Sequence, residues 1–283
     1  MIKGIIFDLD GTLADTMPDL QTAMNRMLKF IGYSERMRVE LIGAINNGAK
    51  EFVRRSLPNE VQDIDFILKS ALREYEKQYS MCYLEKTAPY ENVEAMLMNL
   101  KQKGLKLAVL SNKQDKFVKD IVSKLFDRKT FSVVQGHDKL PLKPNPSSAL
   151  AIAKKMGVKP SQCLIVGDSD VDIQTAKEAG MESIGASWGY RGLEALENAG
   201  ATFIIEDPND VCSIIDYLKS VSKTKNAPKS DLKDYEFFNR KLVATSDFEA
   251  IKQNLTGETA AAKNSNSTGE HTGNVKKKKG NKS

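Results

Sequence analysis

The sequence predicts an α/β fold: a Rossmann-like parallel sheet core with an inserted α-helical cap and a C-terminal low-complexity tail. Three observations predict it. Short apolar runs alternate with stretches of helical period over most of the first 220 residues, as in proteins whose parallel strands are joined by helices. This alternation stops between about residues 16 and 83, where the patterns are helical. After about residue 220 the composition becomes strongly polar.

Six short apolar runs predict strands that are buried on both faces. The first run, Ile2–Phe7, is too short for a helix, and polar residues and a glycine follow it directly. The later runs are Leu105–Leu110, Phe131–Val134, Cys163–Val166, Ser183–Gly185 and Phe203–Ile205.

Amphipathic stretches between these runs predict the helices that cover the sheet. They are Val93–Lys101, Asp115–Leu125, Pro146–Lys155, Val171–Ala179 and Asn209–Leu218. Gly104, Gly157 and Gly180 stand where three of these helices would end, a position that suits a residue with positive φ.

The inserted segment has helical patterns and no convincing strand. The patterns are Asp19–Ile31, Arg38–Leu57 and Ile64–Tyr79. The predicted domains are a core of residues 1–15 and 84–219, a helical cap of residues 16–83, and an extension of residues 220–283 that is mostly disordered.

The C-terminal extension carries the excess of positive charge. From residue 221 onward there are 13 Lys/Arg and 7 Asp/Glu, whereas residues 1–220 hold 29 and 30, so the net charge of +5 belongs to the extension. Asp231–Leu255 retains aromatic residues, and Ser246–Glu249 matches a capping box, which predicts a short helix. From Thr256 onward too little apolar surface remains to offset the entropy of ordering. The run Lys276–Lys279 has no interleaved aromatics, so we expect no specific nucleic-acid binding. The sequence does not identify a partner for the tail.

Composition excludes several classes of protein. Three widely spaced cysteines form neither a disulfide framework nor a metal-finger spacing, and no apolar run approaches the ~20 residues of a membrane span. Two histidines, His137 and His271, make a Ser-His-Asp triad improbable, so acid–base chemistry would use carboxylates. The acidic pair within the first ten residues does not fit a signal peptide, and we expect a cytoplasmic protein without a membrane partner.

The sharpest motif is Asp8-Leu9-Asp10-Gly11-Thr12, which directly follows the first predicted strand. Ligands of open α/β sheets bind beyond the carboxyl ends of the strands, so both carboxylates would face a site. Two like charges so close together are unfavourable unless a cation compensates them, and a hard divalent ion such as Mg²⁺ does so through oxygen ligands. The alternative is an acidic turn that merely ends a strand.

A second acidic cluster, Gly167–Asp172, follows the predicted strand Cys163–Val166 and leads into a helix. The same topology would bring Asp168 and Asp172 close to Asp8 if the strands are neighbours. Alone, the cluster could reflect the preference of aspartate for a helix N-terminus. Together the two motifs predict an oxygen-rich Mg²⁺ site.

Two further segments supply donors and a cation. Ser111-Asn112-Lys113 follows the strand Leu105–Leu110, and Lys143 stands in a loop with prolines on either side of Asn145. A phosphoryl group needs a metal, a cation and several donors for its oxygens. Each segment alone is more often a turn than a site. The two segments support a phosphoryl site only because they occur in one chain with the two acidic motifs.

The order DLDGT, Ser111, Lys143-Pro and GDSDVD resembles that of the haloacid dehalogenase-like phosphohydrolases over about residues 1–218. The helical insertion is similar to the α-helical cap of one class of this family. The motifs FDLDGTLADTMPDLQTAMNRML, SNK, FSVVQG, KPNP, GDSDVDIQTAKEAG and SWGY resemble the phosphoglycolate phosphatase subgroup.

The resemblance implies a role for each motif. Asp8 would be the nucleophile that forms an aspartyl-phosphate, and Asp10 the general acid and then the base. Thr12, Ser111, Asn112 and Lys143 would form the substrate-binding set. The implied metal site comprises Asp8, the Asp10 backbone carbonyl and Asp168, with Asp172 acting through water or by orienting ligands. Because dehalogenating relatives lack the second carboxylate, Asp10 makes haloacid substrates improbable.

The cap is expected to select the substrate. Gly48 and Lys50, in a Gly-containing turn, are the candidate contacts. Arg54 and Arg55 have the alternative interpretation of solvated helix charges. Trp188 and Tyr190 match the subgroup pattern but could pack a core loop, and Lys113 could steer anions or be an ordinary surface lysine.

The expected function is therefore a Mg²⁺-dependent phosphomonoester hydrolase that acts on a small phosphorylated metabolite, first of all 2-phosphoglycolate, as a monomer or homodimer. The alternatives on the same site are a pyrophosphatase, a sugar-phosphate phosphatase or a phosphoglucomutase-like enzyme. A non-catalytic binding or regulatory protein is the alternative of a different class; the intact set of Asp8, Asp10, Ser111, Lys143 and Asp168 argues against it.

Overall fold

The computed structural model of the chain describes residues 1–223. The predicted helix near Ser246, the disorder predicted from Thr256 onward and the lysine run at Lys276–Lys279 lie outside the described residues.

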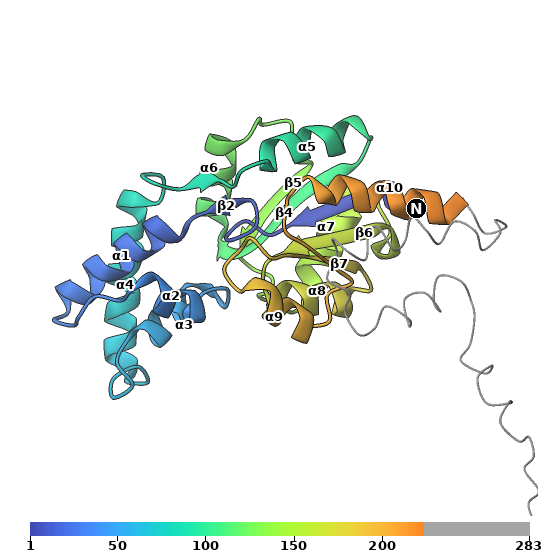
Figure 1. The fold of residues 1–283 in the computed structure, drawn as a ribbon. Coiled ribbons are helices and arrows are strands. Elements are labelled where there is room, and N and C mark those ends of the chain that lie inside the picture. The colour runs from blue at the N-terminus through green and yellow to red at the C-terminus, as the bar shows by residue number, and fades with distance from the viewer. Residues whose placement is uncertain (224–283) are drawn as a thin grey trace, which may run out of the picture. The chain divides into compact units, whose positions relative to one another are not determined.

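A six-stranded parallel sheet forms the centre of the core (Figure 1), and the predicted α/β fold class is confirmed. The strand order is β5-β4-β1-β6-β7-β8. The strands are β1 (Gly4–Phe7), β4 (Lys106–Gln114), β5 (Val133–His137), β6 (Cys163–Gly167), β7 (Glu182–Ala186) and β8 (Phe203–Ile205). β1 lies in the interior of the sheet, which explains why its residues form a continuous apolar run.

Helices cover both faces of this sheet. The core helices are α5 (Val93–Gln102), α6 (Asp115–Leu125), α7 (Ser147–Met156), α8 (Asp170–Ala179), α9 (Gly192–Asn198) and α10 (Asp210–Lys223), with a short 3₁₀ turn at Pro160–Gln162. Ile5 and Phe7 pack with α5, α6 and α10 on one face, whereas Ile6 packs with α7 and α8 on the other. Each of these side chains is fully buried, which stabilises the fold by about 1.5–3 kcal/mol per residue.

Three core helices end close to the glycines at which the sequence predicts helix ends. Gly157 and Gly180 follow α7 and α8 with φ of 64°, and Gly104 has φ of 78° near the end of α5. The helix α9 was not predicted, because its seven residues are too few to establish a period.

The inserted segment is helical (Figure 1). Its apolar side chains form a hydrophobic core that also takes in Phe117 and Tyr190 from outside the insertion. Its helices are α1 (Met17–Phe30), α2 (Arg38–Ala44), α3 (Gly48–Ser56) and α4 (Asp65–Cys82). The helical pattern predicted over Arg38–Leu57 is wrong as one continuous stretch. It is interrupted before α3, where Asn46 has φ of 85° and Gly48 has φ of 81°, values that a continuing helix does not allow.

The two connections between cap and core lie side by side. β2 (Ala14–Asp15) and β3 (Ala88–Pro89) form an antiparallel pair outside the main sheet. Beside them, the buried carboxylate of Asp19 accepts hydrogen bonds from the backbone N–H groups of Lys86 and Thr87, at 3.0 and 2.8 Å. The exit of the cap is therefore fastened to the start of α1.

Among residues 1–223, no helix combines the length and the apolar character that crossing a membrane requires.

Candidate active site

The predicted motifs meet at one edge of the sheet because β1 lies between β4 and β6. Asp8 directly follows β1, Asp168 directly follows β6, and Ser111 and Asn112 lie in the last part of β4. All four residues are at most 7% exposed. Parallel strands present their carboxyl ends at the same edge, so sequence positions about 160 residues apart become neighbours.

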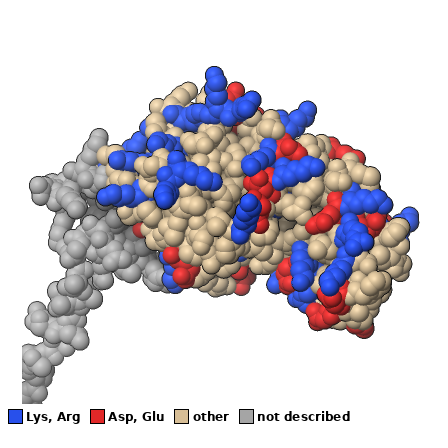
Figure 2. Space-filling view, turned by 180° about the vertical axis from the view of Figure 1, so that it is seen from behind, with Lys and Arg blue, Asp and Glu red and all other residues tan. Residues whose placement is uncertain are grey.

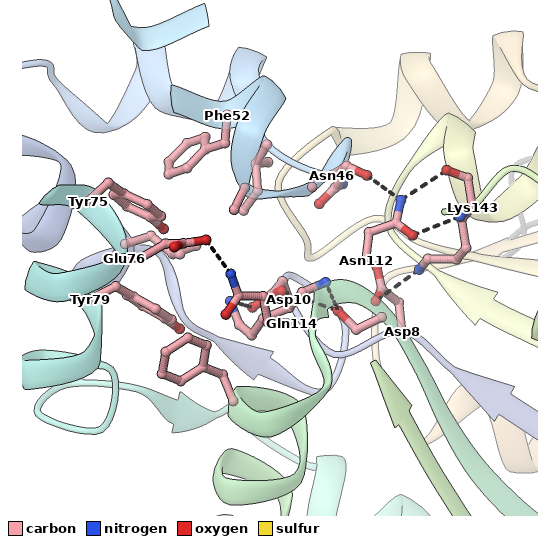
Figure 3. A pocket seen from close by; sticks show the side chains of 17 residues that line it. Asp8, Asp10, Asn46, Phe52, Tyr75, Glu76, Tyr79, Asn112, Gln114 and Lys143 are labelled. Atoms are coloured by element: carbon pink, nitrogen blue, oxygen red, sulfur yellow. Dashed lines mark hydrogen bonds and ion pairs between the residues drawn. The ribbon is translucent and has the colours of Figure 1, made fainter. Parts of the chain in front are cut away.

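A pocket joins this edge to the cap (Figure 3). The core supplies its polar end, with Asp8, Asp10 and Lys143 among the lining residues. The cap supplies a largely apolar wall, which includes the aromatic rings of Phe52, Tyr75 and Tyr79. This wall was not predicted, because an aromatic residue at helical spacing is usually part of a core.

Three carboxylates form a compact cluster at the polar end. Asp8, Asp168 and Asp172 each offer an oxygen, and these oxygens lie within 4.8 Å of one another. Burial and the nearby charge of Asp172 raise the pKa of Asp168 to about 7, and the same two causes raise the pKa of Asp8. A set of buried, mutually repelling carboxylates fits a hard divalent cation, because the ion removes the repulsion and takes oxygen ligands.

Lys143 partly compensates this cluster. Its Nζ lies 3.0 Å from Asp8 Oδ1 (Figure 3). The same Nζ lies 2.6 Å from Asp172 Oδ1. Burial lowers the pKa of the lysine, but the charges of Asp172 and Asp8 more than reverse this effect, so the pKa lies above its ordinary value. Lys143 therefore stays charged beside the carboxylate that is predicted to attack phosphorus.

Asn112 holds the Lys143 loop in place. Its side chain accepts a hydrogen bond from the Lys143 backbone N–H at 2.7 Å and donates to the Lys143 carbonyl at 3.0 Å. The same amide donates to the carbonyl of Asn46 in the cap at 2.8 Å. Asn112 lines the pocket, but its side-chain hydrogen bonds are made to the protein backbone.

Asp10 is not one of the three clustered carboxylates and has other partners. The Thr16 hydroxyl donates a hydrogen bond to its Oδ1, Lys113 Nζ lies 2.9 Å from the same oxygen, and the Ser111 hydroxyl donates to Oδ2 at 3.4 Å. The structure therefore gives Lys113 a specific carboxylate partner in the site, so it is not an ordinary surface lysine.

The loop after β7 supports Asp168. The backbone N–H of Tyr190 donates to Asp168 at 2.8 Å, and the Thr12 hydroxyl donates to the same carboxylate at 3.1 Å. Trp188 Nε1 donates to the Thr12 carbonyl at 3.0 Å. Thr12, predicted to bind substrate, is placed so that its hydroxyl orients Asp168, and the two aromatic residues hold the loops of the site.

Gly189 has no side chain, which allows the loop after β7 to lie close to Asp168 and Gly11. A Cβ at this position would overlap Asp168 Cβ and the carbonyl oxygen of Gly11. We predict that Gly189→Ala lowers Mg²⁺ affinity by about 10–100-fold, because it displaces Asp168, one of the three carboxylates that could hold the ion. Isothermal titration calorimetry measures this loss. Gly43→Ala is the control, since a Cβ at the exposed Gly43 meets nothing within 4 Å; equal affinities in both variants would contradict the prediction.

The raised pKa of Asp168 predicts a pH dependence of Mg²⁺ binding. Because its pKa is about 7 and the cation binds the deprotonated form, affinity should fall as pH is lowered through this value, by up to about tenfold per pH unit. Binding at lower pH should also release a proton. Calorimetry in two buffers with different enthalpies of ionisation detects the proton, and a flat affinity without proton release would refute the expectation.

The candidate cap residues separate into two groups. Gly48 lines the pocket, whereas Lys50 is exposed and lines a different surface cavity together with Arg54. Arg54 lies 2.8 Å from Glu51, and Arg55 lies 2.6 Å from the same carboxylate. Basic and acidic side chains are accordingly intermixed on the cap surface (Figure 2). The structure does not bring Lys50, Arg54 or Arg55 into the pocket beside Asp8.

Fold and site together define a hydrolase of a known class. The sequence model of the haloacid dehalogenase-like hydrolases matches residues 5–186. The chain belongs to this family, and the predicted resemblance to it is confirmed.

Individual relatives of the chain within this family are phosphatases. A phosphoglycolate phosphatase of Pseudomonas putida is 34% identical over 207 residues, which cover 72% of this chain and 76% of the relative. That of Psychrobacter arcticus is 32% identical over 228 residues, covering 78% and 98%. A crystal structure from Haemophilus somnus, described as a predicted phosphoglycolate phosphatase, is 30% identical with a TM-score of 0.70, covering 76% of this chain and 98% of that one. The chain is a phosphatase of this family.

Proposed function

We propose that this phosphatase is a Mg²⁺-dependent phosphomonoester hydrolase of the cytoplasm, and that 2-phosphoglycolate is its preferred substrate. The observation that carries the proposal is that Asp8, with Lys143 3.0 Å away, and Asp10 line the same pocket. The names of the relatives support the choice of substrate, and the small size of the metabolite suits a pocket that is lined by both core and cap side chains.

In the proposed reaction Asp8 attacks phosphorus in line with the bond to the leaving oxygen. A new bond forms between the Asp8 carboxylate and phosphorus, the ester bond breaks, and Asp10 donates its proton to the leaving oxygen. Asp10 then takes a proton from water, whose oxygen attacks the same phosphorus. Phosphate leaves, and Asp8 is regenerated as a carboxylate.

Charged and polar groups stabilise the phosphoryl oxygens during both steps. Lys143 supplies a buried ammonium, and Ser111 supplies a hydroxyl at the end of β4. The carboxylates of Asp8 and Asp168 and the Asp10 carbonyl would hold Mg²⁺, while Asp172 orients Lys143 at 2.6 Å. The bound ion would neutralise charge on the transferring group and on the attacking carboxylate.

A panel of substrates tests this proposal. With Mg²⁺ present, we expect kcat/KM for 2-phosphoglycolate to exceed that for ethyl phosphate, glucose phosphates and pyrophosphate by at least about tenfold, the ratio that corresponds to 1.4 kcal/mol. Faster turnover of pyrophosphate or of a glucose phosphate would favour the alternative activities on this site. If 2-phosphoglycolate is turned over no better than ethyl phosphate, the proposed substrate is wrong. Release of inorganic phosphate is the measurement for every member of the panel.

A further inference from the structure

Lys113 is an unusually enclosed lysine for a residue at a strand end. Its side chain is 7% exposed, and Nζ lies 2.9 Å from Asp10 Oδ1. Among the ion pairs of residues 1–223, this is the one that involves Asp10. A buried ion pair with good geometry fixes the orientation of a carboxylate more firmly than an exposed pair does.

This ion pair distinguishes the two oxygens of Asp10. Oδ1 accepts the hydrogen bond of Thr16 and faces Lys113, whereas Oδ2 has only the long 3.4 Å contact with the Ser111 hydroxyl among the described side chains. Oδ2 is consequently the oxygen that is available for exchanging a proton with a ligand in the pocket.

The same lysine contacts the cap. Its Nζ lies 4.9 Å from the ring centroid of Tyr79, a residue of α4, so a cation–π contact crosses from core to cap. Neighbouring rings hold Tyr79 in place: it stacks on Tyr75 at 5.9 Å and meets Phe117 edge-on at 5.0 Å. Its buried hydroxyl has no hydrogen-bond partner among the residues that the structure describes. The position of this ring therefore depends on packing in the cap.

The residue after Lys113 makes a second link to α4. Gln114 Nε2 donates a hydrogen bond to Glu76 at 2.5 Å, and both residues line the pocket (Figure 3). Two consecutive residues at the end of β4 thus contact one helix of the cap.

We propose that Lys113 is a positioning residue for Asp10, and that its contact with Tyr79 makes the placement of this carboxylate depend on the cap. The proposal rests on the acid–base role that the proposed function gives to Asp10. It assigns to Lys113 the task of holding Oδ1, so that Oδ2 faces the leaving oxygen.

Substrates that differ in their need for a proton provide the test. The phenolate of p-nitrophenyl phosphate leaves without protonation, whereas the alkoxides of ethyl phosphate and 2-phosphoglycolate require an acid. We compare kcat/KM, because it reports the steps up to release of the leaving group and not the later attack of water, for which Asp10 serves as base with every ester. For Lys113→Met we expect kcat/KM to fall by about 100-fold or more on both alkyl esters, and by less than about tenfold on p-nitrophenyl phosphate. Lys113→Arg keeps the charge and should recover part of the loss. Lys119→Met is the matched control, because this lysine is 58% exposed and pairs with Asp115.

Each other pattern of loss overturns the proposal in a recognisable way. An equal loss on all three esters would make Lys113 a merely structural residue. A loss confined to 2-phosphoglycolate would mean that Lys113 binds the carboxylate of the substrate instead of orienting Asp10. Asp10→Asn separates failure of the proposed function from failure of the role of Lys113. If Asp10→Asn leaves turnover of the alkyl esters unchanged, the proposed acid–base function is wrong. If Asp10→Asn lowers this turnover and Lys113→Met does not, only the role of Lys113 is rejected.

Tyr79→Leu tests the contribution of the cap. The same order of losses as in Lys113→Met, with a smaller magnitude, supports the dependence on the cap. An equal loss on all three esters, in a variant whose thermal unfolding midpoint matches that of the parent protein, would reject it.

Discussion

Replacement of Asp8 by asparagine is expected to lower turnover of p-nitrophenyl phosphate by about 10⁴-fold or more, because the amide cannot form the acyl-phosphate bond. The amide has nearly the same shape as the carboxylate, so packing around the 4%-exposed side chain should be preserved. Release of p-nitrophenol in the presence of Mg²⁺ measures the effect. Equal rates in the two proteins would reject the assignment of Asp8 as the nucleophile.

The stability of the Asp8→Asn variant is an internal control. Burial and the neighbouring Asp172 raise the pKa of Asp8, so the folded state resists ionisation of this group. Removing its charge relieves repulsion within the cluster, and without Mg²⁺ we expect no fall in the thermal unfolding midpoint. Loss of activity together with loss of folding would instead point to a structural effect of the substitution.

Replacement of Lys143 by methionine is expected to have the largest effect on stability. The side chain is 3% exposed and contacts both Asp8 and Asp172, so its loss leaves two buried carboxylates without their cation. Removal of one partner from a buried ion pair costs about 3–5 kcal/mol of unfolding free energy. Equilibrium unfolding in urea at neutral pH measures this loss, and Lys119→Met provides an exposed control.

Mg²⁺ should distinguish this electrostatic effect from simple loss of packing. A divalent cation supplies the positive charge that the methionine lacks, so it should stabilise Lys143→Met more than it stabilises the parent protein. If Mg²⁺ stabilises both proteins equally, the lost stability comes from packing rather than from uncompensated charge.

The sequence predicted that the polar motifs lie together, because topology alone brings them to one edge of the sheet. Motifs that follow parallel strands must meet at one edge of the sheet, whatever the details of packing. The Asp8, Ser111 and Asp168 positions needed only the identification of three buried strands. Lys113 was harder to interpret, since a lysine two residues after Ser111 has no distinguishing pattern until its partner Asp10 is placed in space.

The cap contributions to the pocket could not be predicted in the same way. Phe52 and Tyr79 lie on amphipathic helices, where apolar residues normally face the core of their own domain. Both residues belong to the hydrophobic core of the cap and also line the pocket. The sequence makes Lys50 a candidate because its charge lies two residues after Gly48, but its position on α3 places it in another cavity. The direction of a helix face depends on tertiary packing, which the local sequence does not specify.

The paired connections β2 and β3 have a consequence for how such an enzyme can change. The chain leaves the core at Ala14–Asp15 and returns beside the same place at Ala88–Pro89, so the gap that the insertion must bridge is only one strand spacing wide. Any segment whose two ends lie side by side can be joined there without altering the parallel sheet. By this geometry the helical insertion can be replaced as a unit, which would change the cap side of the pocket and leave the carboxylates and Lys143 at the sheet edge in place.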